Sequence, residues 1–583
     1  MKKSILLLSA AIASISCMAA TPADGLTPLL PSGVKANVSQ EQRVYGIKNI
    51  AIAGSAEKGY KAYFTAEDAD HGEELWVTDG TPEGTRMVKD INPGVATSNI
   101  QWLTRFNDKV VFSATSGEDF GQEAWISDGT EEGTYMLADI HEVEGSDPVG
   151  FCQLDESRFV FFAKNLDSEA MNEAGEKWLY ISDGTEDGTS LVAEVDGLWL
   201  GREAGDNRWG CVVRVGRKVF FIGDDADKTG ITHGDELWVT DGTAEGTHMV
   251  KDINLEENKN ALAVAGSTNG AAIAHLQNFY NEKLFFKAWS MDSGNEPWAT
   301  DGTEEGTYEI FNTVPTVNPD NGIGEGGGVT KVGAPYKGNI MFRSRTPEAG
   351  NELGRTNCEK GDYSIYDIDT YAPSSDSHSF PDDGVEFDGK YMFCANSGTR
   401  AGVEDPVQNG GEIHVFDGEK VFCQYDFNPG TGCDWAKELT VCGGSLYWWC
   451  ETPIGTTPAG SLIRLDKWDE APVFAVDNID ANNNGIRTLR NLNGDLIFFS
   501  TANNQLYCYH YRQPDYDPAK NPDNMEINFL TRSEMGGIDD IVADNGEDVP
   551  AVYYNLQGMR VNATTPGLYI RREGSKATKV IIK

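Results

Sequence analysis

Short runs of apolar and aromatic residues recur along the chain, separated by polar stretches rich in glycine, asparagine and aspartate. Nine runs of four residues occur at a mean spacing of about 54 residues, and typical ones are Phe159–Phe162, Val219–Ile222 and Ile497–Ser500. Runs this short that are rich in β-branched and aromatic residues predict buried β-strands rather than helices. We therefore expect an all-β repeat protein.

A second pattern follows the first five of these runs. Five segments align without gaps and share Asp-Gly-Thr-x-x-Gly-Thr after a strand-like start: Glu74–Thr85, Glu123–Thr134, Trp178–Thr189, Glu236–Thr247 and Glu296–Thr307. Their aspartates lie 49 to 60 residues apart. Weaker copies continue as far as Gln505–His510, so the repeat covers most of the chain.

Each unit divides into four predicted strands. In the second unit they are Ile100–Phe106, Lys109–Ala114, Glu123–Ser127 and Thr134–Ile140, joined by turns rich in Asp, Asn and Gly. Four short strands in about 50 residues are typical of a propeller blade. The prediction is a single large β-propeller of eight or nine four-stranded blades plus a small C-terminal β segment. Two smaller propellers are the alternative. The last unit is either incomplete or closed by the N-terminal strand near Val44–Ala53.

The ends of the chain differ from the repeats. Lys2 and Lys3 precede an apolar run and small residues, which is the pattern of a secretory signal. The run is far shorter than the roughly 20 residues of a membrane-spanning helix. Cys17 also allows a lipid anchor. The expected organisation is a signal peptide, a linker, the propeller, a second linker and a C-terminal segment, at residues 1–20, 21–42, 43–531, 532–548 and 549–583.

The repeats resemble the ELWxxDGT repeat of bacterial surface and secreted proteins, most closely from Glu74 to Thr307. Near the C-terminus, Asn555–Val561 and Pro566–Ile570 resemble the type IX secretion sorting segment of Bacteroidetes, although its usual Pro-Asn-Pro opening is absent. The first resemblance implies no particular chemistry. Together they imply an exported protein at the cell surface or outer membrane, in the extracellular medium or in the periplasm.

The recurring aspartates and tryptophans are interpreted as structural. Asp and Thr side chains bond nearby backbone N–H groups in turns, and Gly supplies positive φ. A residue that recurs once per unit suits packing between blades better than a unique sugar platform. The positions are Trp76, Asp79, Trp125, Asp128, Asp183, Trp238, Asp241, Trp298 and Asp301.

Charge and motif content exclude some partners and leave one candidate site. The chain has 47 Lys and Arg against 91 Asp and Glu, a net charge of −44, which argues against nucleic acid and anionic membranes. No local motif defines a catalytic set. Asp480, Asn482 and Asn484 space oxygen ligands at alternate positions before a glycine, as half of a calcium loop does. Asp68–Glu74 is a weaker calcium candidate, and an Asn-rich turn is the alternative for the first.

Cysteine pairing stays open from the sequence. Cys442 and Cys450 fall on one predicted hairpin, and Cys423 and Cys433 on another. Each pair is a candidate disulfide in an exported protein.

Three functions remain. The preferred hypothesis is an exported, non-catalytic propeller that binds glycan or protein, because repetition without a unique catalytic constellation favours recognition. The first alternative is an extracellular carbohydrate-active enzyme, a lyase or glycosidase, with its site built by the long insertions 198–209, 255–270 and 313–328. The second alternative is a structural protein of the cell envelope.

Overall fold

The computed structural model describes most of the repeat region and parts of the C-terminal segment. The described residues are 25–38, 50–55, 58–117, 121–141, 145–164, 177–197, 212–223, 233, 235–253, 271, 273–315, 327–346, 349–369, 378–398, 408–425, 436–450, 460–476, 485–517, 541–543, 552–554, 560–561, 567–573 and 576–582.

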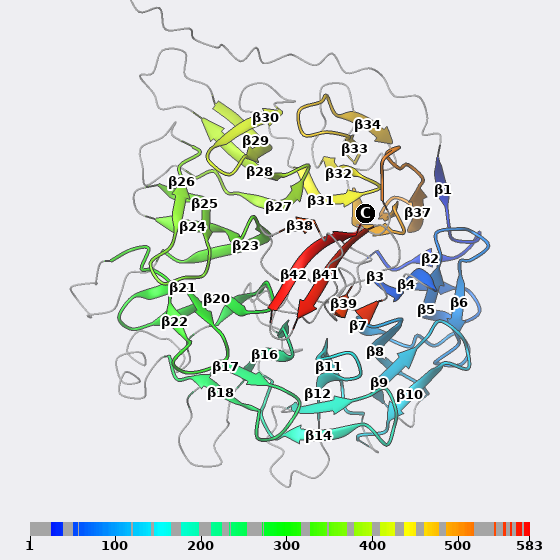
Figure 1. Ribbon diagram of the computed structural model, residues 1–583. Coiled ribbons are helices and arrows are strands. Elements are labelled where there is room, and N and C mark those ends of the chain that lie inside the picture. Colours follow the sequence, from blue (N-terminus) through cyan, green and yellow to red (C-terminus); the bar gives the residue numbers. More distant parts are fainter. Residues whose placement is uncertain are drawn as a thin grey trace, which may run out of the picture.

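Nine antiparallel four-stranded blades stand around a central axis (Figure 1). This confirms an all-β propeller and fixes the number of blades at nine. In blades 1 to 8 the strands run outward in chain order, and the first strands of neighbouring blades contact one another around most of the ring.

The first strand of each blade is the innermost. These strands are β3 (Ile50–Ser55), β7 (Gln101–Phe106), β11 (Val149–Gln153), β15 (Val212–Val215), β19 (Ala274–Phe279), β23 (Val329–Tyr336), β27 (Asp382–Phe387), β31 (Ala436–Cys442) and β35 (Ile486–Leu492). The second strands carry the apolar runs: β4 (Gly59–Asp68), β8 (Lys109–Thr115), β12 (Phe159–Ala163), β16 (Lys218–Gly223), β20 (Lys283–Ser290), β24 (Asn339–Thr346), β28 (Lys390–Gly398), β32 (Ser445–Cys450) and β36 (Asp495–Ser500).

The third and fourth strands complete each blade on the outside. The third strands are β5 (Gly72–Thr78), β9 (Gln122–Ser127), β13 (Trp178–Ser182), β17 (Glu236–Thr240), β21 (Gly294–Thr300), β25 (Gly350–Thr356), β29 (Gln408–Phe416), β33 (Leu462–Leu465) and β37 (Gln505–Tyr509). The fourth strands of blades 1 to 8 are β6 (Arg86–Lys89), β10 (Thr134–Ala138), β14 (Ser190–Ala193), β18 (His248–Lys251), β22 (Tyr308–Glu309), β26 (Ser364–Tyr366), β30 (Val421–Tyr425) and β34 (Val473–Val476).

The N-terminal segment closes the ring. Strand β1 (Leu26–Pro28) pairs antiparallel with β37 and is the fourth strand of blade 9, while β2 (Lys35–Ala36) pairs with β4 of blade 1. The expected closing strand near Val44–Ala53 was therefore misplaced, because that region supplies β3, the inner strand of blade 1. The stretch expected to be a linker, residues 21–42, instead contains the closing strand.

Packing between blades explains why the second strands do not alternate polar and apolar residues. Both of their faces are covered by a neighbouring blade, so the four residues Phe159, Val160, Phe161 and Phe162 are all fully buried. Aromatic rings meet edge to face at several junctions: Phe162 lies 5.0 Å from Phe221. Phe64 and Phe499, 6.1 Å apart, make the same kind of contact where blade 9 meets blade 1. Contacts of this kind stabilise the packing of neighbouring blades.

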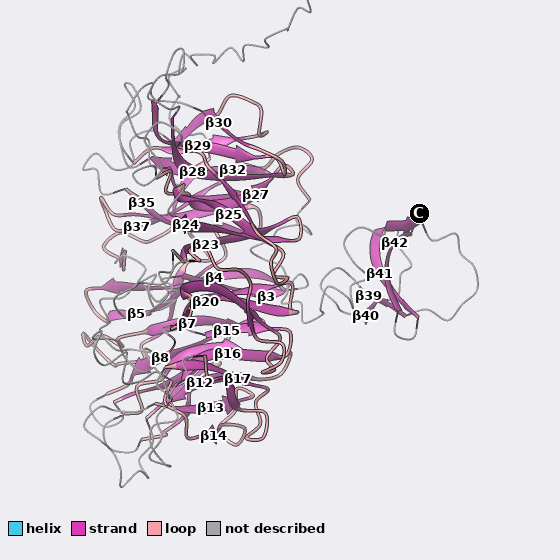
Figure 2. Cartoon of the chain, turned by 90° about the vertical axis from the view of Figure 1, so that its left-hand side faces the viewer, coloured by secondary structure: helices cyan, strands magenta, loops and turns pink. Residues whose placement is uncertain are grey.

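The C-terminal segment forms a separate five-stranded sheet, in the order β38-β42-β41-β39-β40. Its strands are β38 (Ile541–Ala543), β39 (Val552–Tyr554), β40 (Arg560–Val561), β41 (Gly567–Glu573) and β42 (Lys576–Ile582). Figure 2 shows the blades of the propeller edge-on, with their two faces on opposite sides.

Candidate functional site

The recurring aspartate builds the turn between the third and fourth strands. In blade 2, Asp128 Oδ1 accepts bonds from Thr130 N at 2.9 Å and Thr130 Oγ1 at 2.7 Å. Thr130 Oγ1 in turn accepts a bond from Gly133 N at 3.0 Å. The same bonds occur in four other blades, around Asp79, Asp183, Asp241 and Asp301. These carboxylates are therefore committed to turn geometry.

The recurring tryptophans lie inside the blade junctions. Trp76, Trp125 and Trp298 are buried, and Trp238 is half-buried with its ring 6.4 Å from that of Phe221. Indole rings packed in this way are not available as sugar platforms.

The glutamate that opens the ELW sequence has a role that the sequence analysis missed. Glu74, Glu123, Glu236, Glu296, Glu352 and Glu412 occupy one equivalent position of the third strand and are fully buried. Glu123 accepts bonds from Ser146 N at 2.7 Å and from Ser146 Oγ, and Ile140 N lies 3.4 Å from its second oxygen. These donors belong to the crossover into the next blade. Burial raises the pKa of Glu123 to about 7, although its hydrogen bonds with Ser146 and Ile140 act in the opposite direction.

The two faces of the ring differ in the connections they carry. One face holds the tight turns between first and second strands and the Asp-Gly-Thr turns. The other face, here named the crossover face, holds the connections from second to third strands and from each fourth strand to the next blade. The insertions 198–209, 255–270 and 313–328 link β14 to β15, β18 to β19 and β22 to β23, so they start and end at this face.

Inner strands share a bulge close to the crossover face. In blades 2, 3, 5, 8 and 9 its first residue has positive φ: Trp102, Gly150, His275, Glu438 and Thr488. Positive φ is unfavourable for a non-glycine residue, most of all for a β-branched one. Strained backbone of this kind collects at functional sites, and here it recurs near the start of the inner strands.

A basic cluster surrounds one of these bulge residues. His275 is 5% exposed, and its pKa is lowered to about 3, first by burial and then by Lys287, Arg343 and Lys331. Lys331 lies directly opposite Arg343 in the β23–β24 pair and forms an ion pair with Asp382. Like charges at opposed positions repel each other. Three cations in one place are notable in a chain with a net charge of −44.

An exposed aromatic side chain adjoins this basic cluster. Phe380 is 37% exposed and has φ of 46°. Arg343 donates from Nε to the Pro381 carbonyl at 2.9 Å, and its guanidinium lies 5.6 Å from the centre of the Phe380 ring. The His378 ring is 5.0 Å from Phe380 on the other side. The arrangement offers an apolar ring beside an immobilised guanidinium at the crossover face.

The calcium candidates have different outcomes. Asp480, Asn482 and Asn484 lie outside the described residues. In the second candidate, Asp68 Oδ1 accepts bonds from the backbone N–H groups of Asp70 and His71, both at 2.8 Å. Glu73 bonds Asn37, and Glu74 bonds the backbone N–H groups of residues 91 and 92. The structure thus turns these carboxylates in different directions instead of toward one ion.

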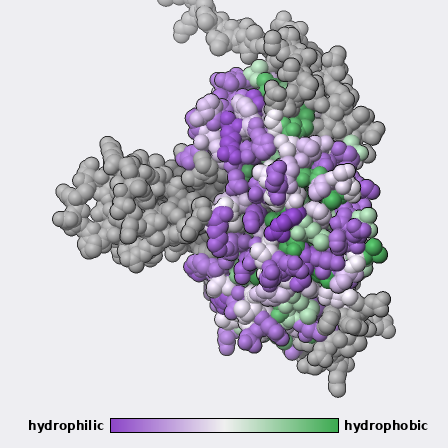
Figure 3. Space-filling view, turned by 90° about the vertical axis from the view of Figure 1, so that its right-hand side faces the viewer, coloured by the Kyte–Doolittle hydropathy of each residue, from purple (hydrophilic) through white to green (hydrophobic). Residues whose placement is uncertain are grey.

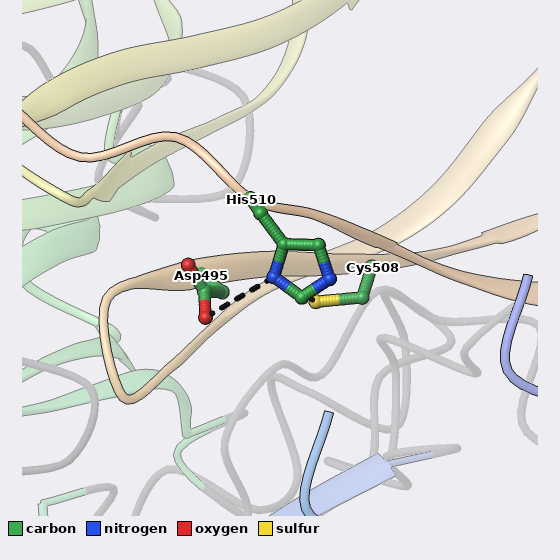
Figure 4. A group of neighbouring side chains, drawn as sticks. All are labelled: Asp495, Cys508 and His510. Carbon is green, nitrogen blue, oxygen red and sulfur yellow. Dashed lines mark hydrogen bonds and ion pairs between the residues drawn. The ribbon is translucent and has the colours of Figure 1, made fainter. Parts of the chain in front are cut away.

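A different set of metal-ligating groups does converge (Figure 4). Asp495, Cys508 and His510 are the three-residue group of this kind within the described part of the chain. His510 Nδ1 lies 3.4 Å from Asp495 Oδ2 and 3.7 Å from Cys508 Sγ. Burial raises the pKa of the Cys508 thiol to about 12, and the charge of Asp495 adds to that effect. Sequence reasoning overlooked this site, although Cys-x-His on a strand places both side chains on one face.

The hairpin register excludes one of the candidate disulfides. Cys442 lies opposite Ser445 at the turn of the β31–β32 hairpin, whereas Cys450 lies opposite Ala436 at its far end. Five residues of strand separate the two positions by about 17 Å, far beyond the Cα separation that a disulfide tolerates. Cys433 lies outside the described residues, so its pairing with Cys423 stays a prediction.

One side of the propeller is mainly hydrophilic. Hydrophilic residues dominate the side of the propeller drawn in Figure 3, and hydrophobic ones are scattered. In the described part of the chain, no helix is long and apolar enough to cross a membrane.

Comparison with known proteins yields matches in solved structures alone. No protein-family model and no curated protein matches the chain. Sqt1 from Saccharomyces cerevisiae is 10% identical over 82% of this chain and 100% of its own, with a TM-score of 0.36. BamB from Moraxella catarrhalis is 9% identical over 84% and 99%, with a TM-score of 0.34. A prolyl endopeptidase is 12% identical over 74% of this chain with a TM-score of 0.35, and the match spans 55% of its length. Such distant matches carry no argument about function.

Proposed function

We propose that this protein is an exported, non-catalytic binding module whose ligand sits on the crossover face of the propeller. The observation that carries this proposal is that the two faces of the propeller carry different kinds of connection. The repeated turns hold one face in a fixed form, while every insertion starts and ends at the other. Rigid strands that present variable connections on one side are a common basis for recognition.

The basic cluster favours an anionic glycan as the ligand. Lys287, Lys331 and Arg343 supply positive charge, of which Asp382 neutralises one unit. Phe380 supplies an exposed ring for the apolar face of a sugar. A carboxylated or sulfated polysaccharide satisfies both features. Protein ligands remain the alternative within the same class of function.

The test is a thermal-shift screen of the mature protein with polygalacturonate, alginate, a sulfated glycosaminoglycan and neutral glucans. A ligand at 100 times its Kd stabilises by about 2.7 kcal/mol. We expect stabilisation by acidic polymers that weakens with added salt. Lys287→Gln and Phe380→Ala should each weaken binding about tenfold, whereas Lys360→Ala, an exposed lysine in the β25–β26 turn on the opposite face, should not.

Two results would count against the proposal. Stabilisation by neutral glucans alone would refute the anionic preference, and a flat panel would favour a protein ligand or an envelope role. The same incubations, analysed for oligosaccharide products, test the alternative of a lyase or glycosidase, because a binding module releases none.

Location is the other part of the proposal. The ELWxxDGT-like repeats, the N-terminal signal pattern and the sorting-like segment 549–583 all support export to the cell surface or beyond. Cys17 supports a lipid anchor as the alternative to signal cleavage after residue 20. Mass spectrometry of the mature N-terminus distinguishes the two, since a lipid-modified protein would begin at Cys17.

A further inference from the structure

Three side chains of types that ligate metals lie on one face of the β36–β37 hairpin, the last hairpin of the propeller. Cys508 and His510 are two residues apart at the end of β37, so strand alternation directs both to the same side. The register pairs Leu496 with Tyr509 and Ile497 with Cys508, which places Asp495 across from His510 on that side. The local backbone therefore brings a thiol, an imidazole and a carboxylate together without any long loop (Figure 4).

Their spacing fits tetrahedral coordination. A zinc ion with Zn–S of about 2.3 Å and Zn–N and Zn–O of about 2.05 Å separates S from N by about 3.6 Å and N from O by about 3.4 Å. The corresponding distances here are 3.7 Å for Cys508 and His510 and 3.4 Å for His510 and Asp495. The remaining pair, Cys508 and Asp495, lies within 4.8 Å.

Arg512 would compete with a metal ion for the carboxylate of Asp495. Its Nε and Nη2 donate to the two oxygens of Asp495 at 3.1 and 2.7 Å. The Arg512 side chain is 46% exposed, whereas that of Asp495 is 18% exposed. A cation that binds His510 and Cys508 must therefore displace Arg512 from one carboxylate oxygen, which the exposed arginine can leave for solvent.

The site lies at the seam of the ring. Cys508 pairs in register with Thr27 of the closing strand β1, and His510 N donates to the Gly25 carbonyl at 2.9 Å. On the other side, Gly80 of blade 1 would bring a Cβ within 3.8 Å of Cys508 Sγ. The three ligands thus stand where blade 9, blade 1 and the N-terminal strand meet.

We propose that Asp495, Cys508 and His510 bind a transition-metal ion of the zinc class that secures the closure of the propeller. One thiolate, one imidazole and one carboxylate form a donor set that zinc accepts, with water in the fourth position. Binding releases the thiol proton to solvent. The ion joins β37 to the start of β36 and so fixes the strand on which β1 closes the ring.

The experiment titrates cobalt(II), as a spectroscopic substitute for zinc, into the metal-stripped full-length mature protein without an affinity tag. We expect one equivalent to bind with a thiolate-to-cobalt absorption band in the near ultraviolet, and zinc to displace it. Cys508→Ala should abolish the band, and His510→Asn should weaken binding at least tenfold. Cys358→Ala removes a buried thiol at the blade 5–6 junction and should leave the band unchanged. Arg512→Gln should tighten binding, by no more than about fivefold.

A wild-type protein without the band, or a band that persists in Cys508→Ala, would overturn the proposal. His510→Asn guards against a folding artefact, because His510 is an exposed residue whose replacement leaves the core intact. Full cobalt affinity in that variant would also overturn it.

Discussion

The buried glutamates predict an unusual dependence of stability on pH, and Glu123→Gln is the perturbation that isolates it. A glutamine resembles the protonated acid: its carbonyl oxygen accepts the bond from Ser146 N, and its amide donates to the Ser146 hydroxyl. The variant therefore keeps both bonds with Ser146, loses the long bond from Ile140 N, and removes the ionisation. Asp139, the charged neighbour that raises the pKa further, is untouched.

The direction and magnitude of the effect of pH on stability follow from the pKa of Glu123. Glu123 has a pKa of about 7 in the folded protein against an ordinary value of 4.5. The folded state therefore binds the proton more tightly, so this stabilisation is complete below pH 4.5 and is lost as the pH rises through 7. The difference corresponds to about 3 kcal/mol. At pH 5 the variant should match the wild type within about 1 kcal/mol, and at pH 8 it should be the more stable by up to about 3 kcal/mol.

The assay is the melting temperature of both proteins at intervals from pH 5 to pH 8 at constant ionic strength. The melting temperature of Glu123→Gln minus that of the wild type should increase by several degrees from pH 5 to pH 8. Glu131→Gln removes an exposed carboxylate from the turn of the same blade, and it controls for the general relief of acidic repulsion. A difference between Glu123→Gln and the wild type that is constant with pH, or that shrinks as the pH rises, would refute the reasoning.

Three further outcomes are expected. Deleting residues 21–30 removes β1 and should lower the melting temperature in a thermal-shift assay, because blade 9 loses its outer strand; an unchanged value would mean that the ring does not depend on this closure. Gly129→Ala should destabilise by about 2 kcal/mol in denaturant titration, since φ is 84° and the new Cβ would lie 2.8 Å from the Tyr63 hydroxyl. Gly117→Ala, with φ of 73° and open space, is its control and should cost about half as much. Deleting residues 549–583 should abolish surface exposure, measured by protease shaving of intact cells, if that segment is a sorting signal.

The blade architecture was predictable because its signal is local. Each four-residue apolar run is a strand buried on both faces, and each Asp-Gly-Thr turn fixes the hairpin that follows. To predict the number of blades, one also has to know which strand closes the ring. Leu26–Pro28 is too short and too polar to be predicted as a strand from the sequence. Only its pairing with β37, more than 470 residues away, defines it as one.

The sites were less predictable, for physical reasons. Glu123 is one of 91 acidic residues, and only its complete burial and its contact with the next blade distinguish it. Cys508 and His510 were readable as an alternating pair on a strand, but Asp495 joins them through hairpin register. The cations around His275 come from β20, β23 and β24, so no sequence window contains them together.

Residues that recur in several blades of this protein form its scaffold, and residues that occur once form its candidate sites. The turn aspartate recurs in all five well-matched repeats and the buried glutamate in four of them, blade 3 having Trp178 at that position. Both residues hold strands and crossovers in place, and a residue used in several blades cannot define one ligand position. The chemistry that occurs once lies at positions that the repeat does not share: Lys287, Lys331 and Arg343 in blades 5 and 6, and the proposed metal ligands of blade 9. In a ring of near-identical units, divergence from the repeat is therefore the better guide to function, and it directs the first experiments to His275 and its neighbours and to the seam at Cys508.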